Sequence, residues 1–127
     1  MRLHPFIIFT FCAYSYAKTT ALSGPTLENQ TNCEASFSIE TSCSGETINT
    51  YMITPGSNLI LNTKELPGIE YNQQFCITVK PNCVDDVNND IQIVSPYFHD
   101  QCTIHYKNLD NEKTILLDEA CFSKKSR

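Results

Sequence analysis

The residues with the widest chemical repertoire in this chain are its seven cysteines, which lie within 127 residues. A cysteine can form a disulfide, bind zinc or act as a nucleophile. No two cysteines have the C-x-x-C spacing of a zinc site, and no two histidines have H-x-x-x-H spacing. Zinc binding is therefore disfavoured, and disulfide formation is the expected use. The odd count leaves one cysteine over, and the N-terminal segment accounts for it.

Residues 1–17 have the pattern of a secretory signal peptide, with a positive charge at Arg2, an apolar run over residues 6–14 and small residues before a cleavage point after Ala17. The apolar run is too short to span a bilayer, which needs roughly 20 residues, so no membrane span is expected. Cleavage would remove 17 of the 127 residues, leaving 110, and would remove Cys12, leaving six of the seven cysteines. Six cysteines in a secreted, extracellular protein indicate three disulfides, and they allow about 15 pairings.

Two histidines of the mature chain, His99 and His105, are candidate general bases. A serine hydrolase needs a nucleophile, a base and an orienting acid, and the chain has no G-x-S-x-G motif. His105 alternates with Ile104 on an expected strand, which predicts a surface position, and His99 lies in a turn-like stretch. Neither histidine is predicted to be catalytic, so the protein is expected not to be an enzyme.

Residues 86–90 have the D-x-N-x-D spacing that begins a calcium-binding EF-hand loop. The sixth position of such a loop needs glycine and is Ile91, and the twelfth needs glutamate and is Tyr97. An Asp/Asn-rich turn explains the segment better, and the neighbouring carboxylates of Asp85 and Asp86 would stay ionised there. No metal and no cofactor is expected.

Composition limits the class of partner. The net charge is −5, and loss of Arg2 with the signal peptide lowers it to −6. Proteins that bind the phosphate backbone carry an excess of lysine and arginine, so no nucleic-acid partner is expected. An acidic surface favours a basic partner and salt-sensitive association. With 41% hydrophobic and 18% charged residues, the chain is expected to fold as one domain.

The elements that must position these residues are short strands. Apolar residues alternate with polar ones, turn signals such as Pro55-Gly56 and Pro67-Gly68 separate the runs, and helical spacing is hard to find. The expected strands lie near residues 36–40, 48–53, 59–61, 75–80, 90–94, 102–107 and 114–117. This pattern predicts an all-β, disulfide-bonded antiparallel sandwich.

The two flanks of this pattern carry no apolar period. Residues 18–32 are rich in Thr, Ser, Asn, Gly and Pro and are predicted to be a flexible N-terminal lead. The only N-glycosylation sequon begins at Asn29 within this lead, so glycosylation of Asn29 is expected. Residues 123–127 form a basic C-terminal tail, which is predicted to be solvated.

An ordered set of short motifs suggests a family. These are Cys43-Ser44-Gly45-Glu46-Thr47, Tyr51-Met52-Ile53, Pro55-Gly56-Ser57, Leu66-Pro67-Gly68, Cys76-Ile77-Thr78-Val79, then Phe98 before Cys102 and a closing Cys121-Phe122. In this order they resemble a CUB domain over residues 43–122. The resemblance is to the CUB domains of insect serine proteases and to stand-alone CUB proteins of arthropod venoms. It implies a jelly-roll-like sandwich, here placed over residues 33–122.

The resemblance also implies a disulfide pattern. CUB domains pair their first two and last two cysteines, which gives Cys43–Cys76 and Cys102–Cys121 and leaves Cys33 with Cys83. Many CUB domains bind calcium through an aspartate three residues after the third cysteine, a position that is His105 here. An imidazole does not replace a hard oxygen ligand, so no calcium site is expected.

Two functions are compatible with these observations. The first is a secreted, non-enzymatic CUB-like binding protein, a component of venom or saliva that acts on an extracellular protein. The second is a small disulfide-rich effector, either a protease inhibitor or a channel-directed toxin. An inhibitor needs a rigid exposed loop, and Lys64-Glu65 and Lys80-Pro81 are the candidate contact sites.

Overall fold

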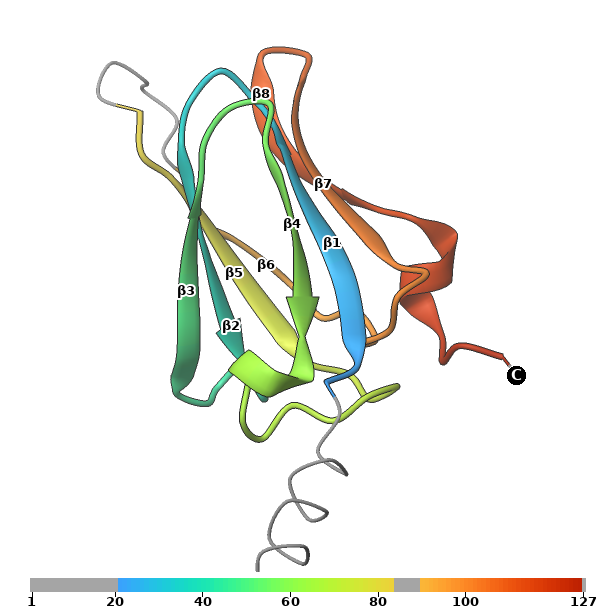
Figure 1. The fold of residues 1–127 in the computed structure, drawn as a ribbon. Helices are drawn as coiled ribbons and strands as arrows, with labels where there is room; N and C mark the ends of the chain where they lie inside the picture. The colour runs from blue at the N-terminus through green and yellow to red at the C-terminus, as the bar shows by residue number, and fades with distance from the viewer. Residues whose placement is uncertain (1–20, 84–89, 127) are drawn as a thin grey trace, which may run out of the picture.

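A computed structural model describes residues 21–83 and 90–126, and Figure 1 shows two β-sheets packed face to face. Sheet A contains, in spatial order, β4 (Asn58–Asn62), β1 (Ser23–Gln30), β7 (Thr103–Leu109) and β8 (Glu112–Leu117). Sheet B contains β3 (Thr47–Ile53), β2 (Ala35–Glu40), β5 (Cys76–Pro81) and β6 (Gln92–Val94). Two 3-10 turns, η1 (Thr63–Glu65) and η2 (Glu119–Phe122), complete the elements. The predicted all-β sandwich is confirmed.

Strand pairing is antiparallel except at one place. The pairs β1–β4, β7–β8, β2–β3, β2–β5 and β5–β6 are antiparallel, whereas β1 and β7 run parallel, with Leu27 opposite Ile104. Parallel neighbours need a long connection between them. Here that connection is most of the chain, because β2 to β6 intervene. The first and seventh strands therefore form the middle of sheet A.

All seven strands expected from the pattern are present, but the prediction of a flexible lead over residues 18–32 is wrong for its structured part. Residues 23–30 of that lead form β1, which lies between β4 and β7. This strand was not predicted because Gly24 and Pro25, near its start, are residues typical of turns. Gly24 is needed there, because a Cβ atom at this residue would lie 2.2 Å from the Cζ atom of Phe98.

The core lies between the sheets and follows the two-residue period of the strands. Its fully buried side chains include Leu27, Phe37, Ile39, Leu61, Ile77, Val79, Ile104 and Tyr106. The ring of Phe37 meets that of Tyr106 edge to face with centroids 6.0 Å apart. At the end where the 66–75 and 95–102 segments meet, Phe75 and Phe98 pack similarly at 5.2 Å. Such edge-to-face pairs add to the free energy gained by burial.

Three disulfides staple the sandwich, and they are the pairs that the resemblance implies. Cys33–Cys83 joins the β1–β2 turn to the end of β5, and Cys43–Cys76 joins the β2–β3 turn to its start. Cys102–Cys121 attaches η2 to the beginning of β7. Each closes a loop of 19 to 50 residues, and such closure stabilises a fold by roughly 3–4 kcal/mol. Three such bonds are compatible with an extracellular protein.

Some of the predicted features lie outside the described residues. The signal peptide over residues 1–17, Cys12, and the acidic pair Asp85 and Asp86 fall in this class. Of the D-x-N-x-D segment only Asp90 is described, and its side chain is exposed. Across residues 21–83 and 90–126, no helix has the length and apolar character that a membrane crossing requires.

Candidate functional site

His105 lies on the outer face of sheet A, at the centre of a hydrogen-bonded bridge between two carboxylates. Its Nδ1 atom is 2.9 Å from Oε1 of Glu28 on β1, and its Nε2 atom is 2.9 Å from Oδ1 of Asp118, just after β8. An ionised carboxylate can only accept hydrogen bonds, so both contacts are satisfied when both ring nitrogens carry hydrogen. The bridge links three neighbouring strands and leaves no ring nitrogen available to act as a base.

The same arrangement does not suit a metal ion. The carboxylates of Glu28 and Asp118 contact opposite nitrogens of the His105 ring and therefore do not converge on one point. Among the described residues, no group of three or more His, Cys, Asp or Glu side chains could hold a metal ion. The other histidine among the described residues, His99, also makes contacts that hold the fold.

His99 is 1% exposed and holds the C-terminal segment in place. Its Nε2 atom lies 2.9 Å from the carbonyl oxygen of Ala120 and 3.0 Å from that of Ser123. Its Nδ1 atom accepts a hydrogen bond from the backbone N–H of Gln101 at 3.2 Å. These contacts assign the neutral ring with its hydrogen on Nε2. No local pattern predicts this burial, because the partners are 21 and 24 residues away.

Beyond His99, the chain end is captured by a small polar site, which we call the tail clip and define as Tyr71, Asn72 and Asp100. The Asn72 side chain accepts a hydrogen bond from the backbone N–H of Lys125 at 2.6 Å and donates one to its carbonyl oxygen at 3.3 Å. The Lys125 ammonium donates to Oδ1 of Asp100 at 2.8 Å, and the Tyr71 hydroxyl donates to the same oxygen at 3.2 Å.

These contacts refine the prediction that residues 123–127 form a solvated tail, because Ser123, Lys124 and Ser126 are exposed as expected, whereas Lys125 is bound to the tail clip. Within the described part of that tail, residues 123–126, Lys125 is half-buried, and Figure 1 shows the red C-terminal segment at the lower right, to one side of the sandwich. The hydrogen bond from the Lys125 ammonium lowers the pKa of Asp100 below its usual value, with a smaller effect from Tyr71. The same hydrogen bond raises the pKa of Lys125. Both shifts favour the charged pair.

The tail clip is held in shape by contacts that do not involve the tail. Asn72 has φ 67°, in the left-handed region that asparagine tolerates better than most residues. Its backbone N–H donates to the carbonyl oxygen of Phe98 at 2.6 Å, and the Phe98 N–H donates to the Gln73 carbonyl at 2.9 Å. Because Phe98 is fully buried, it anchors the Asn72 loop to the core. Tyr71 and Asn72, with Lys125 and Ser126, line a surface hollow next to the clip.

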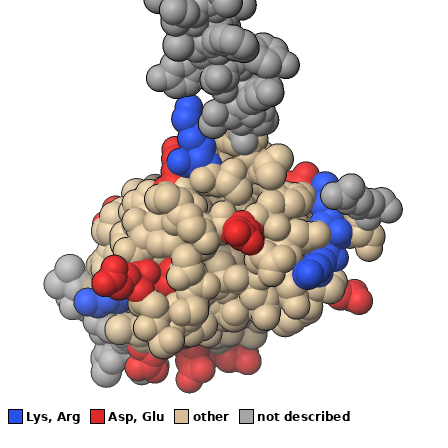
Figure 2. Space-filling view, turned by 90° about the horizontal axis from the view of Figure 1, so that it is seen from below, with Lys and Arg blue, Asp and Glu red and all other residues tan. Residues whose placement is uncertain are grey.

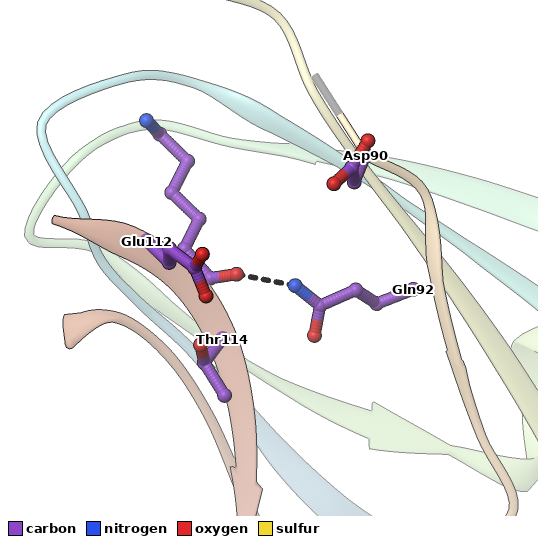
Figure 3. Close-up of a pocket in the computed structure, with 5 residues that line it drawn as sticks. Asp90, Gln92, Glu112 and Thr114 are labelled. Atoms are coloured by element: carbon purple, nitrogen blue, oxygen red, sulfur yellow. Dashed lines mark hydrogen bonds between the residues drawn. The ribbon is translucent and has the colours of Figure 1, made fainter. Parts of the chain in front are cut away.

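A second hollow, between β6 and β8, has a structural explanation. It has a volume of about 80 Å³ and is lined by Asp90, Gln92, Glu112, Lys113 and Thr114. Figure 3 shows the Gln92 amide pointing at β8, where its Nε2 atom donates to the Lys113 carbonyl. Its Oε1 atom accepts from the backbone N–H of Ile115 at 3.0 Å. The side chain thus pairs with the edge of β8 as a neighbouring strand would, and it joins the two sheets.

Asn29, the predicted glycosylation site, is 0% exposed, so the expectation that it lies in an exposed segment is wrong. Its Nδ2 atom donates to the carbonyl oxygens of Cys33 at 2.9 Å and Ile53 at 2.7 Å. Its Oδ1 atom accepts from the backbone N–H of Thr31 at 3.0 Å and from the Thr31 hydroxyl at 2.7 Å. Both sequon residues therefore serve the fold, since they tie β1 to β3 and to the β1–β2 turn.

The two candidate inhibitor contacts lie in regular structure. Lys64 is in η1, whose N-terminus is capped by the side chain of Asn62. The following residue, Glu65, accepts a hydrogen bond from the Tyr51 hydroxyl at 3.2 Å, and burial, followed by the charge of Glu65, raises the pKa of Tyr51. Lys80-Pro81 ends β5 and is paired with β2. Neither site has the extended, exposed loop that an inhibitor presents.

Charges are dispersed over the end of the sandwich seen in Figure 2. Most of this face is free of charged side chains, and the acidic and basic ones form small separate groups, mainly near its rim. Recognition of a basic partner on this face would therefore depend on individual carboxylates more than on a broad acidic surface.

Together these features define a disulfide-bonded β-sandwich whose loops bind its own C-terminal segment. Comparison of the chain with protein-family models, with curated proteins and with solved structures finds no match. The resemblance to CUB domains therefore remains a prediction from the sequence.

Proposed function

We propose that this chain is a secreted, non-enzymatic binding protein of CUB-like type, delivered in venom or saliva, that acts on an extracellular protein. The non-enzymatic part of the proposal is supported by the hydrogen bonds of His99 and His105, the two candidate bases, whose ring nitrogens all have partners within the protein. His99 contacts the C-terminal segment through Nε2 and the backbone of Gln101 through Nδ1, and His105 uses both ring nitrogens in its bridge to Glu28 and Asp118. A general base needs a nitrogen within reach of a substrate proton, and these nitrogens are engaged.

The extracellular part of the proposal rests on the disulfides and on the signal-peptide pattern. Thiol pairs survive as disulfides in oxidising compartments and are reduced in the cytosol. A stapled sandwich is a rigid scaffold, and rigid scaffolds lose little conformational entropy on binding. The inhibitor alternative gains no support, because Lys64 and Lys80 lie in a 3-10 turn and in a paired strand.

The proposal is tested by expressing the full chain in insect cells. We expect it in the medium, beginning at Lys18, with saturable binding to at least one member of a panel of purified extracellular proteins. The reduced and alkylated chain is the control and should not bind. Retention of the chain inside the cell would contradict secretion. Turnover of peptide or ester substrates that disappears in a His105→Gln variant would contradict the non-enzymatic assignment.

A further inference from the structure

We propose that the tail clip of Tyr71, Asn72 and Asp100 is a recognition site for an extended, lysine-bearing segment of a partner protein. In the free protein the chain's own Lys125 occupies it. This inference rests on the proposed function, because it specifies where the binding protein binds and what chemistry the partner must offer. It begins from the observation that Asn72 and Asp100, from two separate loops, both bind one residue near the chain end, Lys125.

The clip recognises two features of the bound segment, the backbone of one residue and the charged side chain of that residue. The Asn72 amide forms hydrogen bonds with both the N–H and the C=O of one residue. A neighbouring β-strand binds a main chain in the same way, whatever the side chain is. The Asp100 carboxylate, 2.8 Å from the ammonium of Lys125, reads the side chain of that same residue. Backbone contacts supply an extended conformation, and the carboxylate selects a basic residue.

Lysine suits the site better than arginine. One oxygen of Asp100, Oδ1, receives both the Lys125 ammonium and the Tyr71 hydroxyl. A single oxygen matches the compact charge of an ammonium group, whereas a guanidinium favours two parallel bonds to both oxygens of a carboxylate. We therefore expect a preference for lysine over arginine at this position.

The clip is preformed, so a partner that binds it does not have to order its loops. Asn72 is fixed by its bond to Phe98, and Asp100 follows the buried His99 in the next loop. Preorganisation of this kind raises affinity by lowering the entropy lost on binding. The surface hollow beside Tyr71 and Asn72 leaves room for residues that flank the bound lysine.

The tail competes with any partner because it is attached. Cys121 is fixed by its disulfide and Ser123 by His99, so Lys125 is presented at an effective concentration on the order of millimolar. A partner must therefore add contacts outside the clip, or it must meet a chain whose tail has been displaced.

The test uses the full chain with the substitution Lys125→Pro, which removes both the backbone N–H that reaches Asn72 and the ammonium that reaches Asp100. The probe is the peptide acetyl-Phe-Ser-Lys-Lys-Ser-amide, which copies residues 122–126, titrated into isotopically labelled protein and followed by NMR. We expect saturable shifts of the Asn72 side-chain amide at peptide concentrations on the order of millimolar. The wild-type chain and the matched control Lys124→Ala, which alters an exposed neighbouring lysine, should bind the peptide about twofold more weakly, because a tail at millimolar effective concentration competes with a peptide of millimolar Kd.

Further variants separate the contribution of the backbone contacts at Asn72 from that of the lysine contact at Asp100. Adding Asn72→Ala to the Lys125→Pro chain should lower its affinity for the peptide by about tenfold, because two hydrogen bonds to the peptide backbone are lost. Adding Asp100→Asn to the Lys125→Pro chain, or replacing the second lysine of the peptide by alanine, should lower the affinity for the peptide by about fivefold. Equal affinity of the peptide for the Lys125→Pro chain with and without Asp100→Asn would overturn the proposal, as would unsaturable shifts.

A second measurement distinguishes this inference from the proposed function. Once an extracellular protein is found that binds the wild-type chain, its affinity for the Lys125→Pro chain is measured. A several-fold gain that Asp100→Asn abolishes supports the clip as the site. Unchanged affinity in both variants leaves the proposed function standing and overturns the clip as its site. Peptide binding without any extracellular partner supports the clip and counts against the proposed function.

Discussion

Asn29→Asp is the sharpest single test of the structure, because it changes one buried group and almost no volume. The Asn29 Nδ2 atom donates two hydrogen bonds, to carbonyl oxygens of Cys33 and Ile53. An aspartate would place an oxygen there, facing two acceptors with no hydrogen to share. The two lost bonds cost about 2 kcal/mol, and the buried charge adds at least about 2 kcal/mol more. A loss of about 4 kcal/mol is a large part of the stability of a small domain.

The loss should depend on pH in a defined direction. Burial and the facing carbonyls raise the pKa of a carboxyl at position 29 in the folded state above its unfolded value of about 3.9. A protonated carboxyl can donate one bond, so the variant is least destabilised below about pH 4 and loses stability as pH rises through the folded pKa. Asn29 itself does not titrate, so the wild-type chain lacks this contribution.

Urea unfolding with the disulfides intact, at pH 4 and pH 7, measures both effects. Asn108→Asp is the matched control, because Asn108 is an exposed residue of β7, and it should change the free energy of unfolding by less than about 0.5 kcal/mol. A loss under about 1 kcal/mol for Asn29→Asp at pH 7 would refute the buried hydrogen-bond network.

The same network leads to an expectation for glycosylation. A glycan on Nδ2 would replace one of two hydrogens that are both bonded, at a residue that is 0% exposed. A glycosylated chain could not adopt this packing, so we expect the folded protein to carry an unmodified Asn29. Intact mass before and after enzymatic removal of N-glycans measures this, and a mass loss from folded protein would contradict the placement of β1.

Three further predictions concern other contacts of the fold. Gly24→Ala should destabilise the fold by about 1–3 kcal/mol in urea, because the new Cβ would overlap the ring of Phe98. Gln92→Ala should cost about 1–3 kcal/mol and speed amide hydrogen exchange along β8, whereas an unchanged exchange rate would count against the pairing of its amide with that edge. The tail contact depends on ionised Asp100, whose pKa is lowered by Lys125, so the contact persists above the usual aspartate pKa of 3.8 and is lost as pH falls below it. NMR titration of the Lys125 amide should give a midpoint below 3.8, and Asp100→Asn should abolish it.

The strands of sheet B and three strands of sheet A, β4, β7 and β8, could be predicted because their evidence is local. Alternating residues such as Phe37 and Ile39 on β2 show which face is buried, and the turn signals at Gly56 and Gly68 coincide with positive φ angles. The number of disulfides followed from counting cysteines, and their partners from the family resemblance. Only β1 was not predicted, because its glycine, proline and asparagine are common in turns. Gly24 and Asn29 are explained by contacts with distant residues, Phe98 and Ile53.

The sequence by itself determined an all-β chain of short strands with its cysteines paired, because alternation and turn chemistry act over a few residues. Tertiary structure decided which polar residues matter. Asn29 is bonded to Ile53, 24 residues away, and Asn72 to Lys125, 53 residues away. Asparagine in a strand and asparagine in a loop look alike in sequence, and only the folded chain brings each amide to the backbone groups that it satisfies.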